Sequence, residues 1–414
     1  MFTPEQGAPT IKLVVTGISI VRSEKAEVIS DMAYGINFRL IQNFEGFPYF
    51  MLNMYTKYNS KNREEIVIVK MKGLMSVLVL VLILLVSGVS YAADVMNVKM
   101  CYNDPPDPEI NAVHEFATNF KRFVELGTNG RITITLYPDS QLGNEEQRME
   151  LTMDGALEIN VASNAGVMSV YPEISAATIP FMFNSFHAAH AFFDKSEYWE
   201  MTKKEFRERT GVALLEAVEE GGFIAFTNNK KEIRSPADFK GMKFRAMDPG
   251  QIALYKSFGA SGTPIPWTEI YMALQTGVVD GQMNPPTYII SGSLYEVQGY
   301  VTMANIQYSC QWLTINNRWL ESLSPEDRYV IKAAAHAANV VNRLSVEAKE
   351  DKKVQFLADK GMKVYYPTPE EMDMFEKIGQ PDYIKWIEAE VSKSYIDAAL
   401  KSAQEANRGV MVSE

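Results

Sequence analysis

The sequence is poor in the residues and motifs on which most enzyme chemistry depends. It has four histidines and two cysteines among 414 residues, which leaves little material for a Ser-His-acid or Cys-His site. No nucleotide-binding glycine motif, H-E-x-x-H or C-x-x-C is present. His187 and His190 are three residues apart on a predicted helix, but no third ligand completes a zinc set. We expect no catalytic residue, metal or cofactor, with an exported enzyme that uses paired carboxylates as the alternative.

Clustered positive charge is also lacking. The formal net charge is -11, and no cluster of Lys and Arg stands out, which argues against nucleic acid as a partner. The apolar, aromatic and charged fractions are those of an ordinary globular protein, and the length allows two domains with separate cores. An anionic ligand would therefore have to be bound by a few well-placed groups.

The two cysteines, Cys101 and Cys310, do not have the spacing of a disulfide framework. Export would permit a disulfide bond between them. Isolated cysteines more often behave as small buried apolar residues, however. We favour two unpaired, buried thiols.

An apolar segment precedes the main part of the chain. Residues 71–92 have a lysine near the start, an apolar run from about Leu74 to Val86 and a small-x-small ending at Ala92, which is typical of a signal peptide cleaved after Ala92. The run is shorter than the roughly 20 apolar residues of a membrane span, and a retained anchor is the alternative. We interpret residues 1–70 as the product of an over-extended start codon.

Strands and helices alternate in the region that follows. Period-two patterns predict strands near 98–102, 131–137 and 157–161, and helical spacing predicts helices near 113–124 and 144–154. This order indicates an α/β fold with a mostly parallel sheet.

Two loops follow the ends of predicted strands. Ligands of such sheets bind at the carboxyl ends of the strands. Asn103 and the small polar loop Ser163–Gly166, which includes Asn164, would by this rule face a cleft. The alternative is that both loops are ordinary connections.

One long helix is expected to join two lobes. Ser235, Ser324 and Thr368 each begin an S/T-P-x-[DE] sequence, which marks the start of a helix. From Ser324 a helical pattern continues to Asp359 without an internal Gly or Pro; at about 1.5 Å per residue it would be on the order of 50 Å long. Because no change of composition marks a domain boundary, the lobes must share several chain crossings.

Three residues between Lys240 and Pro286 are candidates for ligand binding. Arg245 ends a short apolar strand, where a guanidinium either binds a ligand carboxylate through two parallel hydrogen bonds or pairs with a neighbouring acid. Asn284 precedes two prolines and is either a ligand contact or a helix N-cap. Trp267 is either a core aromatic or a pocket wall. The residues alone leave these alternatives open.

The same stretch resembles the signature of a known family. K-G-M-K-F-R-A-M at 240–247, followed by G-A-S-G-T-P-I-P-W-T-E-I-Y-M-A-L-Q-T-G-V-V-D-G-Q-M-N-P at 259–285, is similar to the solute receptors of TRAP (tripartite ATP-independent periplasmic) transporters. Supporting matches are I-P-F-M-F at 179–183 and F-T-N-N-K at 226–230. The resemblance covers about residues 95–400.

The resemblance implies a periplasmic-binding-protein-like, two-lobe α/β fold with the long helix crossing both lobes. It places the family's carboxylate-binding arginine on Arg245, its pocket aromatic on Trp267, its asparagine on Asn284 and a polar contact near the hinge on Gln311. It also implies a periplasmic, non-enzymatic protein that delivers a small organic acid to membrane permease subunits. A monomer is expected rather than a dimer, and a receptor that serves a sensor kinase is a further alternative.

One departure from the family pattern narrows the expected ligand. Many relatives read Gly-Phe-Arg where this sequence reads Gly222-Phe223-Ile224, so a second arginine is missing. The loop Ser163–Gly166 also lacks a charge. We therefore expect a monocarboxylate with an apolar or hydroxylated body.

The expected domain division follows from the two crossings near Glu220 and Cys310. Residues 1–70 are unassigned and residues 71–92 form the signal peptide. Lobe I comprises 93–220 and 310–345, and lobe II comprises 221–309 and 346–414.

Overall fold

The computed structural model describes residues 73, 76 and 95–409. The predicted signal peptide and residues 1–70 lie outside the described residues, except for these two positions. No helix in the described part of the chain is long and apolar enough to cross a membrane.

A five-stranded sheet forms the centre of the first lobe, in the order β2-β1-β3-β10-β4. Its strands are β1 (Met96–Cys101), β2 (Ile132–Tyr137), β3 (Ile159–Ala162), β4 (Val212–Phe223) and β10 (Tyr308–Asn316). β1 is parallel to β2 and β3, whereas β10 is antiparallel to β3 and β4. The predicted alternation of strands and helices is confirmed, but the sheet is mixed because β10 returns from the other lobe.

A six-stranded sheet forms the second lobe, in the order β11-β9-β5-β8-β6-β7. Its strands are β5 (Ala225–Asn228), β6 (Lys243–Ala246), β7 (Ser261–Pro264), β8 (Gly281–Asn284), β9 (Tyr300–Thr302) and β11 (Lys363–Tyr365). β6 is parallel to β7 and β8, and β5 is antiparallel to β8 and β9. The chain passes from the first sheet to the second between β4 and β5, and it returns to the first sheet between β9 and β10.

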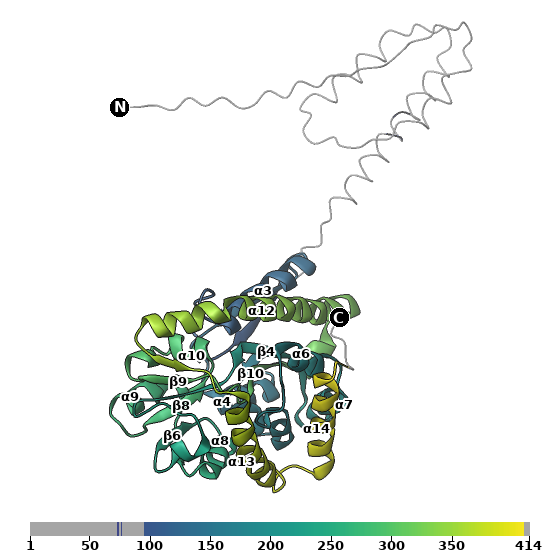
Figure 1. Cartoon of the computed structure of the whole chain (residues 1–414). Helices are drawn as coiled ribbons and strands as arrows, with labels where there is room; N and C mark the ends of the chain where they lie inside the picture. The colour runs from purple at the N-terminus through teal and green to yellow at the C-terminus, as the bar shows by residue number, and fades with distance from the viewer. Residues whose placement is uncertain (1–72, 74–75, 77–94, 410–414) are drawn as a thin grey trace, which may run out of the picture. The chain divides into compact units, whose positions relative to one another are not determined.

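Helices lie against both sheets (Figure 1). They are α3 (Ala112–Gly127), α4 (Glu145–Asp154), α5 (Asn164–Met168), α6 (Phe186–Lys195), α7 (Glu197–Thr210), α8 (Pro249–Ser257), α9 (Ile270–Gln275), α10 (Pro286–Ser291), α11 (Asn317–Ser322), α12 (Pro325–Asp359), α13 (Pro369–Ile387) and α14 (Lys393–Asn407). The three predicted helix starts are confirmed, since Ser235 and Thr368 form capping boxes and Ser324 caps α12.

Helix α12 has the predicted extent and crosses both lobes (Figure 1). It packs against α3 and β4 of the first lobe and against α10 and β11 of the second. Ile331 and Ala338 belong to the apolar core of the first lobe, whereas Val354 and Leu357 belong to that of the second. The small alanines on the first half of the helix allow its close approach to α3 and β4.

The remaining expectations about packing are met in part. Cys101 and Cys310 are buried and not bonded to each other, as predicted. Helix α13 packs against α8 of the second lobe, but α14 packs against α6 and α7 of the first. The proposed domain division should therefore place α14 with lobe I.

Candidate ligand-binding site

Arg245 is a buried cation at the end of β6. Its side chain is 4% exposed, and its Nε donates a hydrogen bond to the carbonyl oxygen of Ile265 at 2.8 Å. Within residues 95–409, no ion pair includes Arg245, so it does not form the salt bridge that the sequence left as its alternative. Burial lowers the pKa of its guanidinium, an effect that Tyr255, Glu145, Asp248 and, least, Glu220 oppose.

Asn164 of the first lobe reaches the second lobe beside Arg245. Its Nδ2 donates to Asp248 Oδ2 at 3.2 Å, and Asp248 caps α8 only three residues after Arg245. The Oδ1 atom of Asn164 is buried without a hydrogen-bond partner. Ser163 and Asn164 were expected in a loop, but Ser163 caps the short helix α5, with its hydroxyl accepting from the backbone N–H of Gly166. The chain thus enters a five-residue helix directly after β3.

Asn103 lies beside a second buried arginine that the sequence did not reveal. Arg148 of α4 is fully buried, and its Nη2 lies 3.5 Å from Asn103 Oδ1. The other guanidinium nitrogens donate to neutral acceptors, namely the side chains of Asn160 and Ser140 and the carbonyl of Gly143. Its hydrogen-bonding capacity is therefore largely used within the protein.

Gln311 lies among acidic groups close to the chain crossings. Its Nε2 is 3.1 Å from Asp104 Oδ2, 2.7 Å from Glu220 Oε1 and 3.0 Å from the hydroxyl of Tyr288. Tyr288 belongs to α10 of the second lobe, and its hydroxyl also donates to Asp104 Oδ1 of the first. Burial raises the pKa of both Asp104 and Glu220, that of Glu220 to about 7. We call Asp104, Glu220, Gln311 and Tyr288 the acidic cluster.

Asn284 and Trp267 both lie on the second lobe. Asn284 ends β8 and its Nδ2 donates to Gln282 Oε1. The N-cap of α10 is Pro285, so Asn284 does not take the capping role that was its alternative. Trp267 is half-buried, and its ring meets that of Tyr288 edge-on at a centroid distance of 5.3 Å. Tyr288 therefore connects Trp267 to the acidic cluster.

Two contacts across the lobes involve predicted residues. Asn164 donates to Asp248, three residues after Arg245, and Gln311 donates to Tyr288, whose ring packs against Trp267. Sequence reasoning missed Asp104, Glu220, Asp248, Arg148 and Tyr288. Each has an ordinary sequence context. Their contacts with other residues become apparent only in the folded structure.

Two glycines form the first crossing between the lobes. Gly221 and Gly222 have φ values of 158° and 89°, which side-chain-bearing residues rarely adopt. A Cβ atom at Gly221 would lie 2.3 Å from Thr287 Oγ1 of α10. The contact across the lobes at this point therefore requires glycine.

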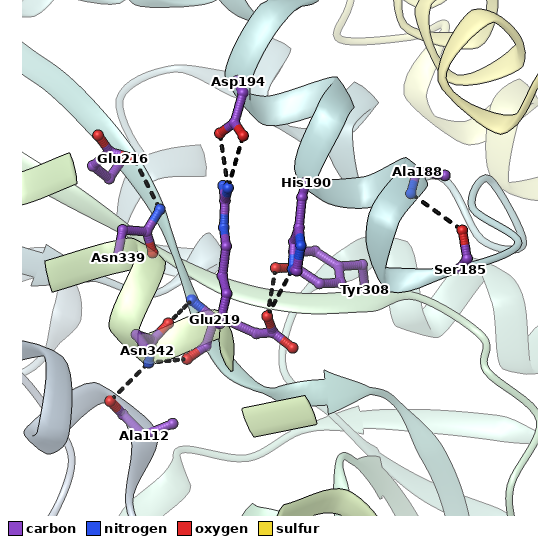
Figure 2. Close-up of polar contacts among 11 residues, drawn as sticks. Ala112, Ser185, Ala188, His190, Asp194, Glu216, Glu219, Tyr308, Asn339 and Asn342 are labelled. Carbon is purple, nitrogen blue, oxygen red and sulfur yellow. Dashed lines mark hydrogen bonds and ion pairs between the residues drawn. The ribbon is translucent and has the colours of Figure 1, made fainter. Parts of the chain in front are cut away.

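A buried polar network lies directly before this crossing (Figure 2). Glu219 Oε2 is 3.1 Å from His190 Nε2 and 3.0 Å from the hydroxyl of Tyr308. Asn342 of α12 accepts from the backbone N–H of Glu219 and donates to its carbonyl. Burial raises the pKa of Glu219 to about 8 and lowers that of His190 to about 4, so burial favours the neutral form of each group.

Replacing Gly221 with alanine should weaken ligand binding at least tenfold. The added Cβ collides with Thr287 of the other lobe, and the strained backbone costs on the order of 1–3 kcal/mol in this arrangement of the lobes. Titration calorimetry on the variant measures the loss. Gly211→Ala is the matched control, because Gly211 also has a positive φ but an added Cβ meets nothing within 4 Å. An equal loss of affinity in both variants would contradict a specific role for the crossing.

Two lobes joined by crossing strands and one long helix define a class of two-lobe solute-binding proteins. A family model confirms this class. Residues 107–389 match the bacterial extracellular solute-binding proteins, family 7. The chain belongs to this family, whose members are the solute receptors of TRAP transporters.

Three relatives illustrate the relationship. A solute-binding protein of Verminephrobacter eiseniae is 31% identical over 69% of this chain and 83% of its own length. The ectoine-binding periplasmic protein of Halomonas elongata is 36% identical over 54% of this chain and 65% of its own. The crystal structure of a TRAP periplasmic solute-binding protein from Polaromonas, bound to D-erythronate, is 29% identical with a TM-score of 0.67 and covers 74% of this chain and 98% of that one.

Other relatives are named for different ligands. They are binding proteins for 2,3-diketo-L-gulonate, sialic acid and C4-dicarboxylates. These names describe transport binding proteins and no enzymes. The family thus fixes the general role of the chain, whereas the ligand depends on its own residues.

Proposed function

We propose that the chain is an exported receptor that captures a small organic acid with one carboxylate and delivers it to the membrane permease of a TRAP transporter. Arg245 is the observation that supports this proposal most. Its guanidinium is buried, yet its only hydrogen bond within the described residues comes from Nε. A ligand carboxylate would accept two parallel hydrogen bonds from the fork of donors and supply the missing counter-charge.

The other candidate residues complete the proposed site. Asn284 would donate to the carboxylate or to an adjacent ligand oxygen, and Trp267 would cover the ligand body. Asn103, Ser163 and Asn164 would be contributed by the first lobe, and Gln311 would lie at the hinge. The unpartnered Oδ1 of Asn164 and Oε1 of Gln311 support this role, because buried acceptors without donors are rare in proteins.

The proposal of a monocarboxylate rests on the lack, among residues 95–409, of a second buried guanidinium free for a ligand; Arg343, for example, is paired with Asp194. Ile224 occupies the position where the family resemblance leads us to expect an arginine, and it is buried between β4 and β5. Arg148 is buried and donates to neutral groups of the protein. D-erythronate, the ligand of the Polaromonas relative, also has a single carboxylate.

The export of the chain is part of the same proposal. We propose that the signal peptide at 71–92 is removed after Ala92 and that the mature protein acts as a periplasmic monomer. Periplasmic names among the relatives support this location. N-terminal sequencing of the exported protein would show a start at Ala93; a start before Ala93 would contradict it.

A panel of organic acids tests the proposed function directly. We expect at least one monocarboxylate among D-erythronate, 2,3-diketo-L-gulonate and ectoine to bind at least tenfold more tightly than succinate. At a hundredfold excess over its dissociation constant, a bound ligand adds about 2.7 kcal/mol to the free energy of unfolding, which a thermal shift detects. A preference for succinate would contradict the single-carboxylate proposal. Proton NMR of the bound acid after prolonged incubation should show no product, whereas turnover would favour the enzyme alternative.

A further inference from the structure

A cavity lies beside β4, the edge strand of the first sheet. Its volume is about 360 Å³, and residues 213–216 of β4 form one wall. Helices α7, α11 and α12 form the other walls. None of the residues proposed to bind the organic acid lines this cavity. Small-molecule sites in proteins have volumes of about 300–1,000 Å³, so the cavity is large enough for a separate ligand.

Three basic residues that line the cavity have no partner for their charge. Lys204 and Arg207 lie one turn apart on α7, on the same side of the helix, and Lys332 lies on α12. All three are exposed to solvent. Their side chains form no ion pair and no hydrogen bond with any residue of the part of the chain that the structure describes. Two helices thus contribute unpaired cations to the walls of one cavity.

The acidic residues of the cavity already have partners. Glu200 and Glu321 form ion pairs with neighbouring basic side chains at 2.6 Å and 2.7 Å. Glu216 accepts a hydrogen bond from Asn339 at 2.8 Å and lies 3.5 Å from a ring nitrogen of His336. The charge that remains unpaired in the cavity is therefore positive. On a chain with a formal net charge of -11, such a local excess of positive charge favours an anion at this place.

We propose that this cavity is a second binding site of the protein and that it takes a phosphate monoester. Such a group carries about 1.5–2 negative charges at pH 7 on three acceptor oxygens, which suits three cations better than a carboxylate with one charge. The guanidinium of Arg207 would bind two of the oxygens with its fork of donors, and the two lysines would act as point charges. Asn317, which also lines the cavity, adds a neutral donor.

The site would work independently of the organic acid. Its walls belong to the first lobe, because Lys332 lies on the half of α12 that packs against α3 and β4. Movement of one lobe relative to the other therefore leaves the cavity unchanged. We expect the affinity for the phosphate monoester to change less than twofold when the protein is saturated with the organic acid.

Matched pairs of phosphates test the inference and distinguish a free ligand from a lipid headgroup. Glycerol 3-phosphate is compared with its diester glycerophosphoglycerol by calorimetry at pH 7, and vesicles that contain phosphatidic acid are compared with vesicles that contain phosphatidylglycerol. We expect a monoester to bind with a dissociation constant of about 1 mM or below, at least tenfold more tightly than its diester. Binding of the vesicles alone would identify the source as a lipid. No saturable binding of either monoester, or equal affinity for the diesters, would overturn the inference.

Variants of the protein locate the bound phosphate. Arg207→Gln and Lys332→Gln each remove one cation from the cavity and should weaken binding of the monoester at least fivefold. Both residues are exposed and unpaired, so the melting temperature should stay unchanged. Lys352→Gln is the matched control, because Lys352 is also exposed on α12 but lies about 30 Å further along the helix. Equal losses in all three variants would show attraction to the surface charge in general and would contradict a site.

The outcome for Arg245 separates this inference from the proposed function. Arg245→Met should leave binding of the phosphate monoester unchanged, whereas it should abolish binding of the organic acid. Arg207→Gln should have the opposite effects. If Arg245→Met removes the phosphate and Arg207→Gln does not, the phosphate occupies the proposed organic-acid site, and the second site is wrong while the carboxylate anchor stands.

Discussion

Replacing Arg245 with methionine is expected to lower the affinity for the organic acid at least a hundredfold. Two charge-assisted hydrogen bonds to a carboxylate disappear, each contributing about 1.5–3 kcal/mol, whereas methionine keeps much of the apolar volume. Calorimetry measures the loss. Arg245→Lys keeps the charge but not the planar fork, and its affinity should fall between those of the wild type and the methionine variant.

The same variant separates a ligand-binding arginine from a structural one. In the absence of ligand, a buried arginine without a carboxylate partner is a cost to stability, so Arg245→Met should leave the melting temperature unchanged or raise it. Removing one partner of a buried salt bridge would instead destabilise the fold by about 3–5 kcal/mol. A large fall in melting temperature without ligand would contradict the proposed role.

The second large effect is expected from Glu219, whose buried carboxyl should make the protein less stable at alkaline pH. Burial raises its pKa from the ordinary 4.5 to about 8. Because the folded state holds this proton more tightly than the unfolded state, its contribution to stability is complete below pH 4.5 and is lost as the pH rises through 8. Each unit of pKa shift corresponds to about 1.4 kcal/mol, so the total effect is on the order of a few kcal/mol.

Glu219→Gln should flatten this dependence and make the protein more stable at pH 8 than the wild type. The groups that act on Glu219 are His190, Tyr308, Arg343, Glu347 and Lys353. Burial also raises the pKa of Glu350, to about 7. Urea unfolding at pH 5 and pH 8 measures the effect. The same measurement on Glu350→Gln shows how much Glu350 contributes to the pH dependence of the stability. An unchanged slope in Glu219→Gln would show that Glu219 is ionised in the folded state.

Local patterns predicted most of the fold. The capping sequences at Ser324 and Thr368 gave helix starts that the structure confirms, because capping depends on residues three positions apart. The extent of α12 followed from the absence of Gly and Pro. The mixed character of the first sheet was not predicted, since the antiparallel pairing of β10 with β3 joins residues about 150 positions apart.

The candidate site was accessible to sequence reasoning only in part. Arg245 stood out because a charge at the end of an apolar strand needs a partner, and the structure places it buried and without an acidic one. Asp104 and Tyr288 could not be recognised, because each becomes distinctive only through the contact that joins the two lobes. Arg148 has the sequence context of a surface helix, although it is fully buried.

The measurement that tests the central claim most directly is a crystal structure of the protein with the tightest-binding acid of the panel. We expect the ligand between the two lobes, with both oxygens of its carboxylate within about 3 Å of the two terminal nitrogens of Arg245, the usual length of such hydrogen bonds. The side chains of Asn284 and Trp267 should contact the same molecule. A ligand bound elsewhere, or a carboxylate that does not touch Arg245, would contradict the account.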